Sequence, residues 1–390
     1  MSSTKSVDLT AWRVPFFDTK FGDEEAAAVL RPLRSGWLTM GEEVLQLEAE
    51  LRQASGAKHA IAVTNCTAAL HLASVAMGVG AGDEVLCPTL TFCATANAPR
   101  STGAFVRFCE STSADDLNVD PESIEKNITP RTRAIFVVHY AGFACQIERI
   151  LEIAGARQIP VIEDCAHALF TSHRGKTLGR FGKVSCFSFF SNKNATCGEG
   201  GAVMTDDDET AERLRLLRSH GMTSLTLDRF KGRAFSYDVA VAGFNYRLDE
   251  IRAALMRAQL QKLPDLLERR RSLFGRYLEQ LAGSPVTTPF ARGEYARELP
   301  STGVHLMPVL LPAGADRLAV MEFMKKQRIQ TSIHYPLVHE FAAYRDSGQS
   351  LPRTEELGKR QLSLPFYPSM DFDQVDLVVR TLHEALTQNS

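Results

Sequence analysis

The 390-residue sequence lacks the features of a membrane-spanning or secreted protein. No apolar run reaches the roughly 20 residues that a membrane-spanning helix needs. Residues 1–8 are polar and lack the apolar core of a secretion signal. We therefore expect a cytoplasmic protein that does not associate with a membrane.

The sequence also lacks a charge bias and a metal-binding cysteine pattern. Its formal net charge is −2, which gives no bulk electrostatic attraction to nucleic acid. The 8 cysteines form no Cys-x-x-Cys pair and no Cys/His cluster at zinc spacing. Cys66, Cys87 and Cys186 lie in apolar stretches and are predicted to be reduced core residues. A nucleic-acid-binding domain, a disulfide scaffold and a structural metal site are therefore disfavoured, and no metal is expected.

The remaining pattern indicates an α/β fold. Short apolar runs alternate with helical patterns, and strands are expected at residues 60–63, 84–87, 134–138, 160–162, 184–189 and 202–204. Because these runs are continuous rather than alternating, they suit a sheet covered by helices on both faces. Strand–helix alternation predicts a mainly parallel mixed sheet sandwiched by helices.

A chain of this length is predicted to form two domains. Residues 249–281 look mostly helical, with a break expected near Pro264, and lead into the second domain. We place a large domain, with the N-terminal segment, at residues 1–264 and a smaller α/β domain at residues 265–390. The smaller domain is expected to hold a strand at 307–311 and helices near 318–327 and 374–386.

Two residues suggest the chemistry. Lys193 follows an apolar run and precedes the glycine-rich segment 198–201, which lets the backbone turn tightly. Asp164 follows Val161-Ile162, so it is placed at the carboxyl end of a strand, where open α/β sheets bind ligands. A lysine that forms a Schiff base, with an acid that holds a pyridinium nitrogen, is what pyridoxal phosphate chemistry needs. Taken alone, Asp164 could instead cap a turn, and Lys193 could be a solvated surface group.

Other residues could complete a site for this cofactor. Thr67 and Ala68 open a helix directly after a predicted strand, and a helix N-terminus with a free hydroxyl is an anion site. Ser188 could add a second hydroxyl to the same phosphate. Phe92 follows a strand and could stack on a pyridine ring. His167 could donate a hydrogen bond to the cofactor's phenolic oxygen, although each of these residues also has an ordinary structural explanation.

In combination, these motifs resemble the DegT/DnrJ/EryC1/StrS family of sugar aminotransferases, pyridoxal phosphate enzymes of the aspartate aminotransferase fold (fold type I). The resemblance rests first on EDCAHA (163–168), on FSF (187–189) with Lys193, and on GEGG (198–201). It extends over nearly the whole chain through VPF (14–16), SGWLTMG (35–41), NCTAALH (65–71), GDEV (82–85), ITPRTRAI (128–135), VHYAG (138–142), GFNYR (243–247), HYP (334–336) and LPFYP (364–368). One departure is Cys165, where alanine is usual.

The resemblance implies a role for each cofactor residue. Lys193 would carry the cofactor as a Schiff base and shuttle the proton, while Asp164 would pair with the pyridine nitrogen. The other implied cofactor contacts are His167 at the phenolic oxygen, Thr67, Ala68 and Ser188 at the phosphate, and Phe92 on the ring. Asn245 resembles the asparagine that reaches the phosphate from a partner subunit, which implies a homodimer with shared sites. Relatives in which histidine replaces the lysine act as dehydratases, so the lysine disfavours that reaction here.

The resemblance also implies the reaction, transfer of an amino group from L-glutamate to a nucleotide-linked keto-deoxysugar. The segments at 36–41 and 138–142 resemble C4-acting members more closely, and Thr39 in the first is a candidate substrate residue. Lys231, Arg233 and Arg247 could bind a diphosphate, and His334 and His339 could face the site from the smaller domain. A C3-acting enzyme, a keto-cyclitol aminotransferase and an aminobenzoate synthase stay open as alternatives. A non-enzymatic regulator is disfavoured, because no basic recognition helix is present.

Overall fold

The structure is a computed structural model that describes residues 12–345 and 348–388. Its strands are β1 (His59–Val63), β2 (Glu84–Pro88), β3 (Phe105–Cys109), β4 (Thr132–Val138), β5 (Val161–Asp164), β6 (Ser172–His173), β7 (Lys176–Thr177), β8 (Val184–Ser188), β9 (Gly201–Thr205), β10 (Met307–Leu310) and β11 (Gln361–Leu364). Its α-helices are α1 (Asp23–Ser35), α2 (Glu42–Ser55), α3 (Cys66–Ala76), α4 (Ala94–Arg100), α5 (Pro121–Asn127), α6 (Ile147–Gly155), α7 (Asp208–Arg218), α8 (Thr226–Phe230), α9 (Glu250–Gln280), α10 (Gly293–Glu298), α11 (Arg317–Lys326), α12 (Pro352–Arg360) and α13 (Phe372–Gln388).

A seven-stranded sheet forms the centre of the molecule, in the order β1-β9-β8-β5-β4-β2-β3. The neighbours from β8 to β3 pair in parallel, whereas β9 runs antiparallel to both β1 and β8. The expected mainly parallel mixed sheet is therefore confirmed. The parallel strands all point their carboxyl ends to one edge, which is where the predicted site residues Asp164 and Ser188 lie.

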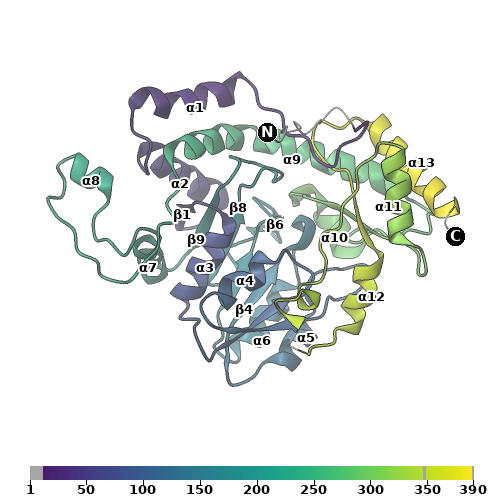
Figure 1. The fold of residues 1–390 in the computed structure, drawn as a ribbon, viewed down its shortest axis with the longest axis horizontal. Helices are drawn as coiled ribbons and strands as arrows, with labels where there is room; N and C mark the ends of the chain where they lie inside the picture. Colours follow the sequence, from purple (N-terminus) through teal and green to yellow (C-terminus); the bar gives the residue numbers. More distant parts are fainter. Residues whose placement is uncertain (1–11, 346–347, 389–390) are drawn as a thin grey trace, which may run out of the picture.

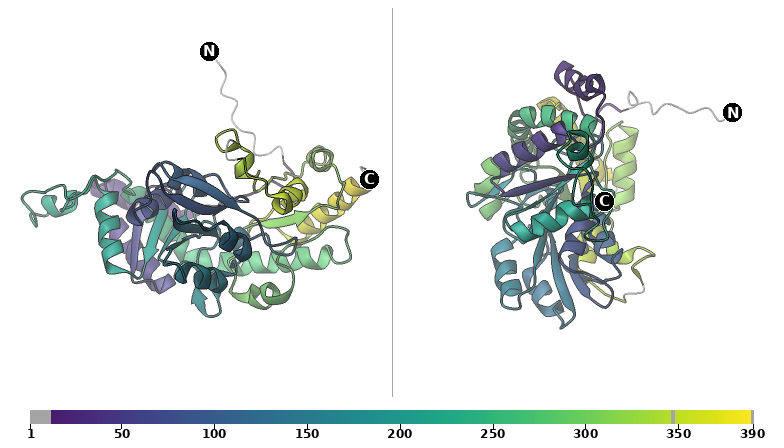
Figure 2. Two further views of the ribbon diagram at one scale, coloured as in Figure 1. Left: turned by 90° about the horizontal axis from the view of Figure 1, so that it is seen from below. Right: turned by 90° about the vertical axis from the view of Figure 1, so that its left-hand side faces the viewer.

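Helices cover both faces of this sheet (Figures 1 and 2). Ile61 and Val63 of β1 pack with α3, α4 and α7 in one apolar core. Ala60 and Ala62, which point to the opposite face, pack with α2 and the first half of α9. The helices α5 and α6 cover the other part of that second face. Burial on both faces explains why the strands are continuous apolar runs.

The C-terminal part of the chain packs around the second half of α9. The antiparallel pair of β10 and β11, together with α11 and α13, shares one core with Leu273, Phe274 and Tyr277 of that helix. The break expected near Pro264 is wrong, because α9 runs unbroken from Glu250 to Gln280. Leu263 and Leu267 on either side are buried, so tertiary packing outweighs the hydrogen bond that proline cannot donate. The division proposed at residue 264 thus falls inside one helix and stays a prediction.

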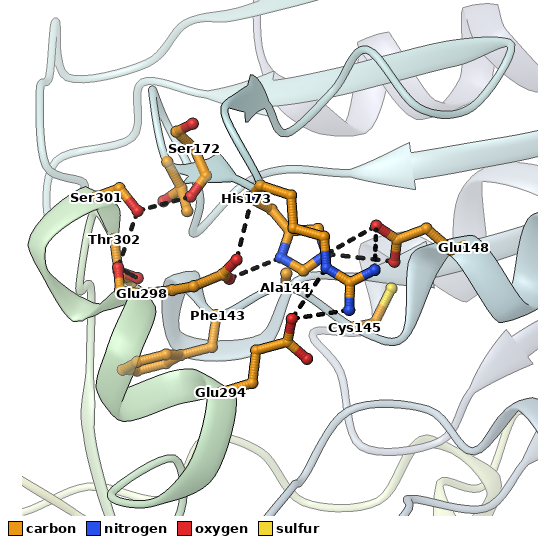
Figure 3. Close-up of polar contacts among 12 residues, drawn as sticks. Phe143, Ala144, Cys145, Glu148, Ser172, His173, Glu294, Glu298, Ser301 and Thr302 are labelled. Carbon is orange, nitrogen blue, oxygen red and sulfur yellow. Dashed lines mark hydrogen bonds and ion pairs between the residues drawn. The ribbon is translucent and has the colours of Figure 1, made fainter.

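Away from the sheet edge, charged side chains tie the β6–β7 hairpin to α6 and α10 (Figure 3). His173 Nδ1 lies 2.6 Å from an oxygen of Glu298, and Nε2 lies 3.0 Å from an oxygen of Glu148. Arg174 pairs with Glu294 at 2.8 Å and with Glu148 at 3.4 Å. We call these five residues the His173 cluster. His173, Glu294 and Glu298 lie close enough to share a metal ion, but the ion pairs already account for their positions.

None of the helices in residues 12–345 and 348–388 is long and apolar enough to cross a membrane.

Candidate active site

A cavity of about 820 Å³ opens at the carboxyl edge of the sheet. Its walls come from the end of β5, the loop after β8, the start of α3, the residues before α4 and the segment around residues 334–335. Of the predicted site residues, those that line it are Thr67, Ala68, Phe92, Asp164, His167, Ser188, Lys193 and His334. The structure thus brings together residues from five separate parts of the sequence.

Asp164 is the acid at the floor of this cavity. Its side chain accepts a hydrogen bond from Thr95 Oγ1 at 2.8 Å and one from the backbone N–H of Ala166 at 3.1 Å. Burial nevertheless raises the pKa of its carboxyl above the ordinary value, against these two bonds and the attraction of Lys193. A buried carboxylate with no ion-pair partner among the described residues suits a ligand that brings a protonated nitrogen.

Lys193 enters the cavity from the loop after β8. Burial lowers the pKa of its amine from 10.5 to about 8, although the charges of Cys66 and Asp164 oppose this shift. The glycines that follow keep this loop close to α3: Gly198 adopts a φ of +83°, and a Cβ on Gly201 would lie 2.7 Å from the carbonyl carbon of Asn65. A lysine of lowered pKa is available as a nucleophile and a base near neutral pH.

Three buried histidines lie near this lysine. His167 Nε2 lies 2.8 Å from Tyr335 Oη, and its ring centroid lies 4.6 Å from that of His305. His305 Nε2 lies 3.4 Å from Lys193 Nζ. Burial and then the lysine charge lower the pKa of His167 and His305 well below the ordinary value, and that of His334 to about 4. All three are therefore neutral hydrogen-bonding groups at neutral pH. The sequence interpretation missed His305, because no local motif links it to Lys193.

The phosphate end of the predicted site is a helix N-terminus. Asn65, not Thr67, is the N-cap of α3, and its Oδ1 accepts a hydrogen bond from Ala68 N at 2.8 Å. Thr67 is exposed in the first turn, so its hydroxyl is left for a ligand. Ser188, at the end of β8, lines the same cavity. Helix N–H groups and two hydroxyls form a set that can hold a phosphate.

The residues present therefore fit pyridoxal phosphate. Asp164 is a buried acid for a pyridinium nitrogen, and Lys193 is an amine for the aldehyde carbon. The exposed ring of Phe92 lines the same cavity and can contact a flat aromatic group.

Other predicted residues do not line the cavity. Thr39 and Arg233 are exposed, Arg247 is partly buried, and Asn245 is exposed beside a bridge to Ser219. His339 is buried elsewhere, with Nδ1 2.7 Å from Thr89 Oγ1 and Nε2 3.3 Å from Glu355. His339 therefore has a structural role within this chain. The segment around α8 projects from the body of the subunit (Figures 1 and 2), and Arg233 N donates to the carbonyl oxygen of Asp228 in α8. Asn245 lies instead beside the end of α7, where it pairs with Ser219.

Comparison with known proteins identifies the family. Residues 19–383 match the model of the DegT/DnrJ/EryC1/StrS aminotransferase family. The chain is 37% identical over 382 residues to the spore coat polysaccharide biosynthesis protein SpsC of Bacillus subtilis, covering 95% of this chain and 96% of that protein.

Solved structures are also similar. The PLP form of the putative sugar aminotransferase Spr1654 from Streptococcus pneumoniae has a TM-score of 0.89 and 25% identity, covering 97% of this chain and 99% of the other. DesI, solved in the presence of its TDP-sugar product, has a TM-score of 0.85 and 30% identity, covering 97% and 93%. The chain belongs to the DegT/DnrJ/EryC1/StrS aminotransferase family, and it is a sugar aminotransferase of fold type I that depends on pyridoxal phosphate.

Proposed function

We propose that this family member transfers the amino group of L-glutamate to C4 of a keto-deoxysugar carried on a nucleotide. The observation that carries the proposal is the buried pair of Lys193 and Asp164, whose pKa values are shifted toward the neutral forms at one cavity. Two further features support the substrate class. DesI was solved with a TDP-sugar product, and the segments at 36–41 and 138–142 resemble those of C4-acting enzymes.

The proposal gives each cavity residue a task. When bound, pyridoxal phosphate supplies an electron sink for the carbon that loses a proton. Asp164 keeps a proton on the pyridine nitrogen, and the carboxylate charge balances it. Thr67, Ala68 and Ser188 bind the phosphate, and Phe92 packs against the ring. His167 donates a hydrogen bond to the cofactor's phenolic oxygen or to the hydroxyl of Tyr335. His334 lines the cavity that receives the substrate.

Lys193 moves the proton. As a free amine it removes the α-proton of the donor amino acid, and in the second half-reaction it delivers a proton to the carbon of the sugar that receives the amino group. It must be neutral to act as the base. A pKa of about 8 leaves a useful neutral fraction near pH 7 to 8, whereas a pKa of 10.5 would not.

A shared active site between two subunits completes the proposal. The segment that includes α8 carries exposed apolar side chains, among them Phe230, Phe235 and Tyr237. Because apolar groups gathered on a projecting segment favour a protein interface, we propose that this segment packs on a second subunit of a homodimer. Asn245 and Arg233 would then reach the partner's cavity, which explains why they do not line their own. A cytoplasmic location stays a prediction.

A single half-reaction tests the substrate. The protein is loaded with pyridoxamine phosphate and mixed with nucleotide sugars that carry a ketone at C4 or at C3, and with a keto-cyclitol. Return of the absorbance of the lysine-bound cofactor reports amino transfer. We expect the fastest return with a C4-keto nucleotide sugar. A faster return with the C3 ketone or the cyclitol overturns the C4 assignment and leaves the aminotransferase identity intact.

A further inference from the structure

The contact between Lys193 and His305 has a defined donor and a defined acceptor. His305 precedes β10 and lies 112 positions along the chain from Lys193, yet its Nε2 is 3.4 Å from Lys193 Nζ. It is only 4% exposed. The other side of the ring faces Asn194, the residue next to the lysine, with Nδ1 3.1 Å from Asn194 Oδ1. The imidazole thus bridges the reactive amine and the backbone loop that carries it.

The hydrogen bonds of Asn194 determine which ring nitrogen of His305 carries the hydrogen. Asn194 Nδ2 donates to the carbonyl oxygen of Gly303 at 2.8 Å, and a carbonyl oxygen can only accept. The amide nitrogen of Asn194 must therefore face Gly303, which leaves Oδ1 facing His305. Because Oδ1 can only accept, Nδ1 of His305 carries the hydrogen. A neutral imidazole has one N–H, so Nε2 presents a lone pair to Lys193.

The surroundings keep this imidazole neutral. Burial lowers the pKa of His305 well below its ordinary value, and the nearby positive charges of Lys193 and Arg270 lower it further. No carboxylate of the described residues forms an ion pair with His305. The other titratable groups that act on the amine are Asp164 and Cys66, which face Lys193 rather than the imidazole. His305 Nε2 can therefore accept a hydrogen from the amine but does not bring a proton of its own.

We propose that His305 is a positioning residue for proton transfer, whose Nε2 accepts an N–H of Lys193 and holds the amine in one orientation. In the step itself, the C–H bond at the α-carbon of the donor breaks and a new N–H bond forms on Nζ. The electron pair stays with the substrate and its bound cofactor, and no proton passes to His305. The ammonium that results is stabilised by a charge-assisted hydrogen bond to Nε2. This inference rests on the role proposed for Lys193.

The titration of Lys193 tests the proposal without measuring turnover. In the enzyme loaded with pyridoxamine phosphate, Lys193 is a free amine, and its acetylation by trace acetic anhydride can be followed by peptide mass spectrometry across pH. Lys183, which is 43% exposed, serves as the reference amine in the same digest. Replacing His305 with phenylalanine removes the acceptor, so we expect the apparent pKa of Lys193 to fall by about one unit.

Matched variants separate this role from a structural one. In His305→Gln, a side-chain amide oxygen can take the place of Nε2, so we expect the titration of Lys193 to stay near that of the wild type. Asn194→Leu keeps the His305 ring but removes the acceptor that fixes its tautomer. We therefore expect the pKa of Lys193 to fall less than it does in His305→Phe. The Asn194 variant keeps the test available if His305→Phe does not fold. If all three variants titrate as the wild type does, the proposal is overturned.

A kinetic measurement completes the test. The ascending limb of the pH–rate profile for the half-reaction with the amino donor should move to lower pH by the same amount in His305→Phe and not in His305→Gln. A uniform loss of rate with an unchanged profile in both variants indicates a packing role and overturns the proposal. Failure of the role of Lys193 itself is distinguishable, because Lys193→Ala would then retain amino transfer whatever the state of His305.

Discussion

The Lys193 cavity and the His173 cluster both gather histidines, carboxylates and cations, but they arrange them oppositely. In the His173 cluster each carboxylate lies within ion-pair distance of a basic side chain, since the ring nitrogens of His173 face Glu148 and Glu298, and Arg174 faces Glu148 and Glu294. In the cavity, the histidines face a lysine, and Asp164 is held by neutral donors. Of these two regions, the cavity therefore holds the buried ionisable groups that lack an ion-pair partner among the described residues.

This difference means that the His173 cluster contributes to stability, whereas the cavity is arranged for function. A compensated cluster ties a hairpin to two helices and favours the folded state. A buried amine and a buried carboxylate without close partners destabilise the folded chain, and a ligand that pairs with them recovers that free energy. Both regions cluster titratable residues, so clustering alone does not distinguish the cavity from the His173 cluster, whereas burial without an ion-pair partner does. Four changes test this contrast.

The largest effect is expected at the lysine itself. Lys193→Ala removes both the amine that holds the cofactor and the base, so amino transfer should be lost by several orders of magnitude. The absorbance of the lysine-bound cofactor should disappear as well. Lys183→Ala, which removes an exposed lysine paired with Asp207, is the matched control and should leave both signals unchanged. Turnover of Lys193→Ala at the wild-type rate would contradict the site.

The acid should come next. Asp164→Asn keeps the shape of the side chain and one of its two acceptor oxygens, but it removes the negative charge proposed to hold a pyridinium proton. By analogy with the loss of one preorganised electrostatic group, kcat should fall roughly 10²- to 10³-fold. Glu148→Gln in the His173 cluster makes the same chemical change and should leave kcat unchanged. Equal losses in the two variants would remove the distinction between the two regions.

In the cofactor-free protein, replacing the lysine should increase stability, although the same position is needed for activity. The folded pKa of Lys193, about 8, lies below its unfolded value of 10.5. The unfolded chain therefore binds more protons between these values, and the cost of the buried charge is fully present below pH 8 and disappears as pH rises to 10.5. Lys193→Met should raise the free energy of unfolding at pH 7 by about 1–3 kcal/mol.

Urea unfolding of the cofactor-free protein and of Lys193→Met at several pH values measures this difference. We expect the gap between the two proteins to close as pH rises from 8 to 10.5. A gap that stays constant with pH would show that the methionine stabilises by packing rather than by removing a charge.

The smallest effect is expected in the His173 cluster. His173→Ala leaves Glu148 and Glu298 without their shared partner and should lower the free energy of unfolding by about 1–2 kcal/mol. Because the cluster lies away from the cavity, kcat and the spectrum of the bound cofactor should stay at the wild-type values. Glu355→Ala, which removes an ion pair to the similarly buried His339, provides a second structural position for comparison.

Several elements of the fold could be predicted from the sequence, and the predictions that failed have identifiable causes. The strands with mostly apolar runs were predicted within one or two residues, because burial on both faces favours apolar side chains at successive positions. β3 and β11 were missed, since Arg107 interrupts one run and Gln361 and Ser363 interrupt the other. Arg107 pairs with the buried Glu84, a contact between strands that no local pattern indicates.

The sequence by itself determined the family and predicted the lysine and its acid, because Asp164 ends β5, Lys193 follows β8, and the carboxyl ends of neighbouring parallel strands meet at one edge. Only the tertiary structure decided which distant residues join them. It placed His305 against Lys193, left His339 outside the cavity and assigned the cap of α3 to Asn65. The physical reason is that local spacing fixes where a strand ends, whereas the packing of separate segments fixes which side chains face one another and which charges lose their water.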